Sequence, residues 1–383
     1  MMINHYNFAI DLRYAENKNS GLTRFSKNLF LNLIKEESLK KKNFLLILPP
    51  KSESDHLEEF KNLNSSNKKI IYWNTKRNWK WKLGIYYFDF KLFLILKRSK
   101  IDTYINPFMD PPFVPGIDVI STIHDITFLK VNNYFNKFDN LKKFIGEIRI
   151  LITILISKKI LTVSYSTRKE LIKRYFFLPK NLKTKLNETL IIPNGIIKPI
   201  QDKNICLPKY FPKYYFLYVG DRRPHKNIEY LIELISELRK ELSEDVYLVI
   251  AGSKQYKNKS LEKKILNNQK FIFEFEEPKD NELFFLYKNC KAFFLLSISE
   301  GFGIPLIEAA VQGAKLIAND IPPLREIGPK NTLFIKCKST LSDVKKIKNY
   351  LLKKNNINAD KTLSKFQWKH SSKKLSAFLL KIC

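Results

Sequence analysis

The feature that most constrains the fold of this chain is an alternation of strand-like and helix-like segments that occurs twice. Short apolar runs such as YNFAIDL, FLLILPP and DVISTIHDI are separated by longer amphipathic stretches such as FSKNLFLNLIKEE. A second series starts at KYYFLYVG and continues through VYLVIAG, KFIFEFE and AFFLLSIS. This pattern is typical of parallel sheets with helices on both faces. We therefore predict an α/β fold with two doubly wound, Rossmann-like domains.

The segment between the two series, residues 191–212, is rich in proline and turn formers and has little periodicity. We place the domain boundary there, with residues 1–197 in the first domain and 198–363 in the second. At 383 residues with 44% hydrophobic content, the chain can give each domain its own core. Ligands of doubly wound domains bind at the carboxyl ends of their strands, so the active site is expected in a cleft between the domains.

The chain is strongly basic, with 68 lysine and arginine residues against 37 acidic ones and a formal net charge of +31. Such a charge favours an anionic partner, either nucleic acid or a membrane surface. Residues 72–100 mix Trp73, Trp79 and Trp81 with basic and apolar side chains, as interfacial membrane segments do. The alternative is a core helix with a solvated basic face. No known RNA or DNA motif is present, so we expect no nucleic-acid partner.

No segment of the sequence predicts export or membrane insertion. The first residues, MMINHYNFAIDLRYA, lack the features of a signal peptide and are predicted to form a buried strand. The most apolar passage, Phe144 to Val163, is interrupted by charged residues at 147, 149, 158 and 159, so no transmembrane helix is predicted. The four cysteines lie far apart, which predicts neither a zinc site nor disulfides. We expect a cytoplasmic protein that contacts the inner leaflet of the membrane.

The segment SEGFGIPLIE, residues 299–308, carries the most specific pattern. It follows an apolar strand, and Pro305 is well placed to begin a helix that ends at Gly313. Glu300 then lies at the end of the strand and Glu308 one turn into the helix, while Gly301 and Gly303 allow a close approach of backbone to a ligand. Carboxylates accept hydrogen bonds from sugar hydroxyls, and amides at a helix N-terminus favour phosphate. The alternative is a solvated loop followed by a glutamate that stabilises the helix dipole.

A second pattern, YFLYVGDRRPHKNIEYLI, predicts a strand that ends at Gly220, a basic loop, and a helix that begins near Asn227. The loop carries Arg222, Arg223 and Lys226. Such a site binds a diphosphate and stabilises the charge that grows on it as a leaving group, which makes a metal ion unnecessary. In the first domain, His124 follows an apolar run, and a loop leads to Gly21, so both are expected to face the cleft. No GxGxxG or Walker A pattern occurs.

Together these segments resemble the glycosyl transferases group 1, also called family 4, which are retaining enzymes of the GT-B architecture. The motifs that carry the resemblance extend over nearly the whole chain: DLRYAENKNSGLTRFSKNL, TIHD, VSYSTRKEL, IPNG, YVGDRRPHKN, ISEGFGIPLIEAAVQGAKLIAND and FQWKHSSKKL. The resemblance also implies that a C-terminal helix, residues 364–383, packs back on the first domain, with Trp368 at the joint.

The resemblance implies specific roles for these residues. Glu300 lies near the transferred sugar, and Glu308 holds the ribose of the donor. Arg222 or Arg223, with Lys226, binds the diphosphate. The amides of Gly301, Phe302 and Gly303 contact the sugar and the phosphate. His124 lies by the sugar and the acceptor, and Gly21 lets the first loop close over the donor. The donor is a nucleotide diphosphate-sugar, and no metal or other cofactor is required.

The function that we predict is retaining transfer of a hexosyl residue, with mannosyl transfer from GDP-mannose as the leading expectation. The acceptor is a saccharide or a polyprenyl-diphosphate-linked saccharide in the synthesis of surface polysaccharide, lipopolysaccharide or O-antigen. Three alternatives stay open: a UDP-sugar-dependent transferase of the same fold, a nucleotide-sugar 2-epimerase, and a non-enzymatic basic protein that binds nucleic acid or membrane. The sequence does not identify the acceptor, the linkage, the oligomeric state, or which of Arg222 and Arg223 contacts the diphosphate.

Overall fold

The computed structural model describes residues 5–16, 20–63, 67–73, 90–135, 138–197, 205, 207–242, 245–354 and 357–382. The chain forms two compact units. The first comprises Met1–Ile126, Asn140–Gly195 and Gln367–Cys383, and the second comprises Thr127–Asp139 and Ile196–Phe366. Each unit is built around one parallel sheet, which confirms the predicted class of two parallel-sheet α/β domains.

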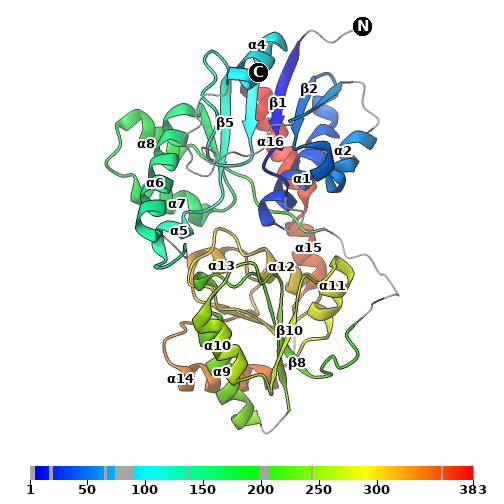
Figure 1. Ribbon diagram of the computed structural model, residues 1–383, viewed down its shortest axis with the longest axis vertical. Helices are drawn as coiled ribbons and strands as arrows, with labels where there is room; N and C mark the ends of the chain where they lie inside the picture. Colours follow the sequence, from blue (N-terminus) through cyan, green and yellow to red (C-terminus); the bar gives the residue numbers. More distant parts are fainter. Residues whose placement is uncertain are drawn as a thin grey trace. The chain divides into compact units, whose positions relative to one another are not determined.

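The sheet of the first unit has seven strands in the order β3-β2-β1-β4-β5-β6-β7, and all its pairs are parallel (Figure 1). Its strands are β1 (Tyr6–Asp11), β2 (Phe44–Leu48), β3 (Lys68–Tyr72), β4 (Ile101–Asn106), β5 (Asp118–Ile123), β6 (Lys159–Thr162) and β7 (Leu190–Ile191). Every residue of β2 is buried, as expected for a parallel strand that is covered on both faces.

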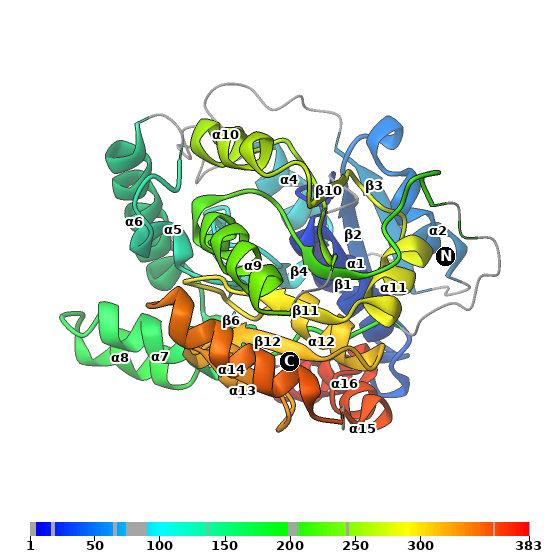
Figure 2. The same cartoon turned by 90° about the horizontal axis from the view of Figure 1, so that it is seen from below.

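Helices of the first unit connect these strands, as parallel pairing requires. They are α1 (Gly21–Ile34), α2 (Glu58–Asn62), α4 (Phe90–Arg98), α6 (Asp139–Ile156), α7 (Tyr165–Arg174), α8 (Lys180–Asn187) and α16 (Trp368–Ile382), with short 3-10 turns at Glu37–Leu39, Lys51–Glu53 and Asp55–Leu57. Helices α7 and α8 lie side by side (Figure 2).

The C-terminal helix α16 packs against α1 within the first unit (Figure 1). Trp368, at its start, is buried and meets the ring of Phe25 edge-on at 5.9 Å. The backbone of Gly195 approaches Trp368 so closely that an added Cβ would lie 2.4 Å from its amide nitrogen. The tryptophan therefore joins α1, α16 and the chain near the boundary in one core.

The sheet of the second unit has six parallel strands in the order β10-β9-β8-β11-β12-β13. They are β8 (Tyr215–Val219), β9 (Tyr247–Ala251), β10 (Ile272–Phe275), β11 (Ala292–Leu295), β12 (Leu316–Asn319) and β13 (Leu333–Ile335). The helical elements of this unit are α5 (Thr127–Lys130), a 3-10 turn (Pro224–Lys226), α9 (Ile228–Leu242), α10 (Lys259–Asn267), α11 (Asp280–Asn289), α12 (Ile304–Val311), α13 (Pro322–Ile327), α14 (Thr340–Leu352) and α15 (Ala359–Lys365).

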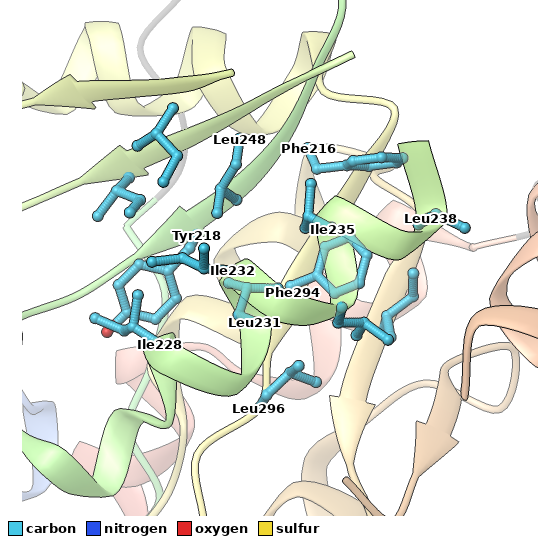
Figure 3. Packing of buried hydrophobic residues seen from close by; sticks show 14 of the residues in the cluster. Phe216, Tyr218, Ile228, Leu231, Ile232, Ile235, Leu238, Leu248, Phe294 and Leu296 are labelled. Atoms are coloured by element: carbon cyan, nitrogen blue, oxygen red, sulfur yellow. The ribbon is translucent and has the colours of Figure 1, made fainter. Parts of the chain in front are cut away.

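The core of the second unit lies between this sheet and α9. The apolar residues of α9 recur at helical spacing, and the buried ones, among them Leu231 and Ile235, pack with Phe216, Leu248 and Phe294 of the strands (Figure 3). This packing fixes the start of α9, and with it the loop that precedes the helix. Of the helices that the structure describes in either unit, none has the length and hydrophobicity needed to cross a bilayer.

The segment Thr127–Asp139 belongs to the second unit, although the sequence analysis grouped it with residues 1–197. Its contacts explain the difference. The Thr127 hydroxyl lies 3.1 Å from that of Ser299, and the Tyr256 hydroxyl donates to the carbonyl of Asn133 at 3.0 Å. A short piece of chain from the N-terminal half is thus anchored beside the loops that follow β9 and β11.

Candidate functional site

The candidate site of the second unit lies where the strand order of its sheet reverses, between β8 and β11. Connections from these two neighbouring strands leave in opposite directions, which opens a crevice at their carboxyl ends where ligands of doubly wound sheets bind. The loop after β8 carries the VGDRRPHKN pattern, and the loop after β11 carries EGFG. The fold therefore brings the two most specific motifs of the sequence to one edge of one sheet.

Lys226 and Glu300 join these loops directly. The Lys226 ammonium donates to Glu300 Oε1 at 2.7 Å, and their side chains are only 14% and 12% exposed. Burial alone would lower the pKa of Lys226, but the negative charges of Glu300 and Asp221 outweigh burial and raise that pKa above its ordinary value. Lys226 is therefore held as a cation at the switch point of the sheet.

Arg222 forms its ion pair with a residue on the opposite side of β8 from Glu300. Its side chain is buried and donates to Oε1 of Glu274 on β10, and Lys254 donates to the second oxygen of the same carboxylate at 3.2 Å. Strand β10 lies beyond β9, whereas Glu300 follows β11 on the opposite side of β8. The structure therefore pairs Arg222 with Glu274 rather than with the carboxylate that Lys226 contacts.

Arg223 is half exposed and contacts the anchored segment Thr127–Asp139. Its Nη1 donates to the Tyr134 hydroxyl at 3.1 Å, and its guanidinium carbon lies 5.6 Å from the centroid of that ring. Tyr134 in turn stacks on His225, with centroids 5.3 Å apart and planes inclined by 27°. The Asp221 carboxylate accepts from the backbone N–H of Arg223 at 3.2 Å. Two of the loop's basic residues thus rest on one tyrosine.

Glycines permit the close packing of these loops. Gly220 has a φ of +154°, and a Cβ there would lie 2.7 Å from the hydroxyl of Tyr218. Gly303 has a φ of +96° and precedes α12, where a Cβ would lie 2.5 Å from Leu324. Phe302 is buried and meets Phe366 edge-on at 6.0 Å, so its side chain belongs to the core. Gly301, Phe302 and Gly303 form the turn between Glu300 and α12.

Helix α12 begins at Ile304, one residue before the predicted Pro305, and ends at Val311, before Gly313. Glu308 lies on its second turn and is almost fully buried, at 9% exposure. Its Oε2 accepts from the Tyr287 hydroxyl of α11 at 2.9 Å. A buried carboxylate held in this way has a fixed orientation, which suits recognition of hydroxyl groups.

The remaining predicted residues, His124 and Gly21, belong to the first unit. His124 follows β5, and its Nε2 lies 2.8 Å from the carbonyl oxygen of Pro107, which requires Nε2 to carry the proton. Burial lowers the pKa of His124 in spite of that hydrogen bond. Gly21 is the first residue of α1, where Ser20 caps the helix by accepting from the N–H of Thr23.

Most of the basic aromatic stretch predicted to meet a membrane, including Trp79 and Trp81, lies outside the described residues. At its start, Trp73 is buried and packs under Arg13, whose guanidinium carbon lies 4.9 Å from the ring centroid. Within the described ranges, no three His, Cys, Asp or Glu side chains are grouped so that they could hold a metal ion.

Three residues that orient this site were not predicted from the sequence: Tyr134, Glu274 and Tyr287. No motif marks them, because each lies in a different element from the residue that it contacts. An unusual density of aromatic residues in VNNYFNKF is the one available signal for Tyr134.

Comparisons with known proteins find similar sequences that include these motifs. A family model described as Glycosyl transferases group 1 matches residues 207–365. The chain is similar to that family over these residues. The matched residues contain both loops, Glu300 and Glu308.

The chain spans about half the length of the curated relatives that it matches. The O-antigen chain mannosyltransferase RfbU of Salmonella typhimurium is 31% identical over 183 residues, which are 46% of this chain and 46% of that protein. The O-antigen chain mannosyltransferase B of Escherichia coli is 28% identical over 221 residues, which are 54% of each chain. Among solved structures, HepE of Anabaena in complex with UDP and glucose has a TM-score of 0.68 at 13% identity, over 98% of this chain and 100% of that one. At that identity, the likeness shows the GT-B fold alone.

Proposed function

We propose that the protein is a retaining glycosyltransferase that moves a hexosyl residue from a nucleotide diphosphate-sugar to a saccharide or polyprenyl-diphosphate-linked acceptor. The match of residues 207–365 to the group 1 family model supports the class of reaction. The likeness to two O-antigen chain mannosyltransferases favours a mannosyl donor, GDP-mannose, and a place in the synthesis of surface polysaccharide.

The observation that carries the proposal is the pair of Lys226 and Glu300 at the β8 and β11 strand ends. A cation is needed where the negative charge of the leaving diphosphate grows, and a carboxylate is needed beside the sugar. The pair supplies both at the point of the sheet where phosphorylated ligands bind. Its low exposure strengthens each electrostatic interaction, because little water screens the charges.

We assign the diphosphate contact to Lys226 and Arg223. The charge of Arg222 is already neutralised in part by Glu274 on the other side of β8, so Arg222 holds the loop in place. Arg223 is half exposed and is oriented by Tyr134, which leaves it positioned for a ligand at the strand ends. Gly220 lets the loop backbone lie close to its neighbours without a side chain in the way.

We assign the donor ribose to Glu308 and the sugar to the turn that contains Gly301, Phe302 and Gly303. The carboxylate of Glu308 is oriented by Tyr287 and accepts hydrogen bonds from hydroxyl groups. In this proposal the backbone N–H groups of this turn donate to the phosphate or to the sugar, because the N-terminus of a helix favours a negatively charged group. From the first unit, His124 is proposed to contact the sugar and the acceptor, and Gly21 to let the first loop close over the donor.

The reaction that we propose retains the anomeric configuration and requires no metal ion. The bond between the anomeric carbon and the diphosphate oxygen breaks, and the acceptor oxygen bonds to the same face of that carbon. The acceptor proton passes to the departing phosphate oxygen, so no protein nucleophile is used. Lys226 and Arg223 stabilise the negative charge that appears on the diphosphate.

Three alternative functions predict different experimental results. A UDP-sugar donor would use the same residues, and the UDP complex of the structurally similar HepE makes it the second candidate. A nucleotide-sugar 2-epimerase would release a modified sugar without an acceptor. A basic nucleic-acid binder would show salt-sensitive binding to nucleic acid but no affinity for nucleotide sugars.

The first experiment is thermal unfolding with GDP, UDP, ADP and dTDP in the presence of EDTA. A nucleotide at about 100 times its dissociation constant adds roughly 2.7 kcal/mol to the free energy of unfolding. Stabilisation by one nucleotide names the donor class, and transfer assays with the corresponding sugars then identify the donor. Nuclear magnetic resonance of the product distinguishes retention from inversion. If no nucleotide stabilises the folded protein, the proposed donor site is wrong.

We also propose that the protein contacts the inner leaflet of the cytoplasmic membrane from the cytoplasm. The net charge of +31 supports this contact, because anionic lipids attract basic proteins. A polyprenyl-linked acceptor would lie in that membrane.

A further inference from the structure

Helix α6 is apolar on two opposite faces. One face is buried against the first unit and contains Gly146, Ile150, Thr153 and Ile154. Residues at spacings of three, four and seven form the other face, on which Leu141, Phe144, Ile148 and Leu155 are 56%, 64%, 38% and 58% exposed. A helix of a water-soluble domain normally turns a polar face to solvent, so the outward apolar face of α6 requires an explanation.

The apolar surface extends to the end of α7. Arg174 donates from Nε to Glu147 at 2.7 Å, which holds the end of α7 beside the middle of α6. Phe176 and Phe177 follow that arginine and are 71% and 61% exposed. We call the four outward residues of α6, together with these two phenylalanines, the α6 surface.

The region that carries the α6 surface is strongly basic. Residues 139–187 contain twelve lysine and arginine residues against three acidic ones, a formal net charge of +9. Lys142, Lys173, Lys180 and Lys183 are exposed on the three helices of this region. Glu147 is engaged with Arg174, and the Asp139 carboxylate accepts from the backbone N–H groups of Asn133 and Phe135.

This combination fits an anionic lipid bilayer better than a second copy of the chain. Two copies that met on this surface would bring like charges together, which opposes association. A bilayer accepts aromatic and aliphatic side chains at the boundary of head groups and acyl chains, while its anionic head groups attract the lysines. The α6 passage is too interrupted by charge to span a membrane, and it has the makeup of a helix that lies along the surface.

We propose that the α6 surface is the membrane-docking face of the first unit. This inference rests on the proposed membrane contact and assigns it to α6 and α7. Phe144, Ile148, Phe176 and Phe177 enter the interface, and the neighbouring lysines bind anionic head groups.

Sedimentation of the full chain with vesicles tests the proposal. The vesicles are phosphatidylcholine alone or phosphatidylcholine mixed with phosphatidylglycerol, at low and high salt. Wild-type protein is expected to bind the anionic vesicles, and to bind less at high salt. The double variant Phe144→Ser/Ile148→Ser is expected to bind about tenfold more weakly or worse, because two apolar side chains no longer leave water. The double variant Lys173→Gln/Lys180→Gln is expected to weaken vesicle binding by a similar factor, since each lysine near an anionic surface strengthens binding about fivefold.

The matched control is Leu341→Ser/Leu352→Ser on α14, which removes two leucines that are 77% and 80% exposed in the second unit. Its vesicle binding should equal that of wild type. Hydrogen exchange of the wild-type protein gives a second measurement, in which anionic vesicles should slow exchange in peptides of α6 and of residues 174–177.

The outcomes separate this inference from the proposed enzyme. If the wild-type protein does not bind anionic vesicles, the proposed membrane contact is wrong. Stabilisation of the protein by a nucleotide tests the donor site independently of that result. If wild type binds vesicles, and both the α6 variants and α6 hydrogen exchange are unaffected, the α6 surface is not the docking face. If the α6 variants instead abolish self-association, the occupant is a second copy, and the inference is wrong.

Discussion

Lys226 Nζ lies 2.7 Å from Glu300 Oε1, so the residues that we propose to act on the diphosphate and on the sugar hold each other in position. Substitution of either residue leaves the other partly buried without its counter-charge. Mutational effects at this pair therefore need a readout of ligand binding as well as one of stability.

Substitution of Lys226 by methionine should abolish most of the transfer activity. The cation that we propose to stabilise the leaving diphosphate is lost, and the removal of one such donor typically lowers kcat by about 100-fold to 1,000-fold. Steady-state kinetics with the donor identified by the thermal experiment measure the effect. Lys240→Met, on an exposed lysine paired with Glu237, is the control and should keep full activity. Near-normal kcat in the Lys226 variant would contradict the assignment.

The adjacent arginines should respond differently to substitution by alanine. Arg223→Ala is expected to weaken nucleoside diphosphate binding about tenfold with little change in thermal stability, because a charged hydrogen bond to ligand is lost. Arg222→Ala is expected to lower the free energy of unfolding by roughly 1–3 kcal/mol, because Glu274 loses its main partner. Calorimetric titration and denaturant unfolding measure the two quantities. The reverse pattern would assign the diphosphate to Arg222.

Substitution of Tyr134 by phenylalanine tests the positioning of Arg223. The ring that stacks on His225 is retained, while the hydroxyl that accepts from Arg223 is removed. Nucleoside diphosphate binding should weaken several-fold, by about the 0.5–1.5 kcal/mol of one hydrogen bond, while monophosphate binding changes less. Equal losses for both nucleotides would show that Tyr134 acts on something other than the diphosphate contact.

Asp11 and Arg13 form a buried pair in the first unit, with Arg13 Nε and Nη2 each 2.9 Å from a carboxylate oxygen. Asp11→Asn leaves the buried guanidinium without a full counter-charge, so the free energy of unfolding should fall by about 3 kcal/mol or more. Asp102→Asn is the control, because its partner His5 is half exposed and the expected change is below about 1 kcal/mol. Denaturant unfolding at neutral pH compares the two variants.

His124 should make the protein less stable in mild acid. Its pKa in the folded protein is lowered by burial, so the unfolded chain binds more protons at the pH where a free histidine titrates. Stability is therefore full above a pH of about 6.5 and declines as the pH falls below it. Wild type should lose stability relative to His124→Gln between neutral pH and pH 5. Parallel curves for wild type and His124→Gln would rule out this linkage.

Much of the second unit could be predicted from local sequence. Its strands are short apolar runs, and β8 and β11 are fully buried because both faces of a parallel sheet are covered. The glycines and Pro305 place the turn and helix after Glu300 to within one residue, because these residue types have few alternative conformations. Lys226 and Glu300 meet because the carboxyl ends of neighbouring parallel strands share one edge.

The roles of Arg222 and Arg223 could not be separated in this way. The two residues are adjacent and chemically identical, and the difference between them comes from Glu274 and Tyr134, which lie 52 and 89 positions away from their partners. The position of Thr127–Asp139 in the second unit could not be predicted from the sequence either. A segment of that length has no periodicity that predicts which sheet it will join. Its contacts with Ser299, Tyr256 and Arg223 place it in the second unit.

The course of the chain through the two units has a consequence for protein engineering. The backbone passes from one unit to the other after residues 126, 139, 195 and 366. A truncated product that starts at Ile196 would therefore omit the tyrosine against which His225 stacks, even though it would contain every residue that the family model matches. The second unit is assembled from two separate stretches of chain, so an autonomous version must be made by fusing residues 127–139 to it through a new linker.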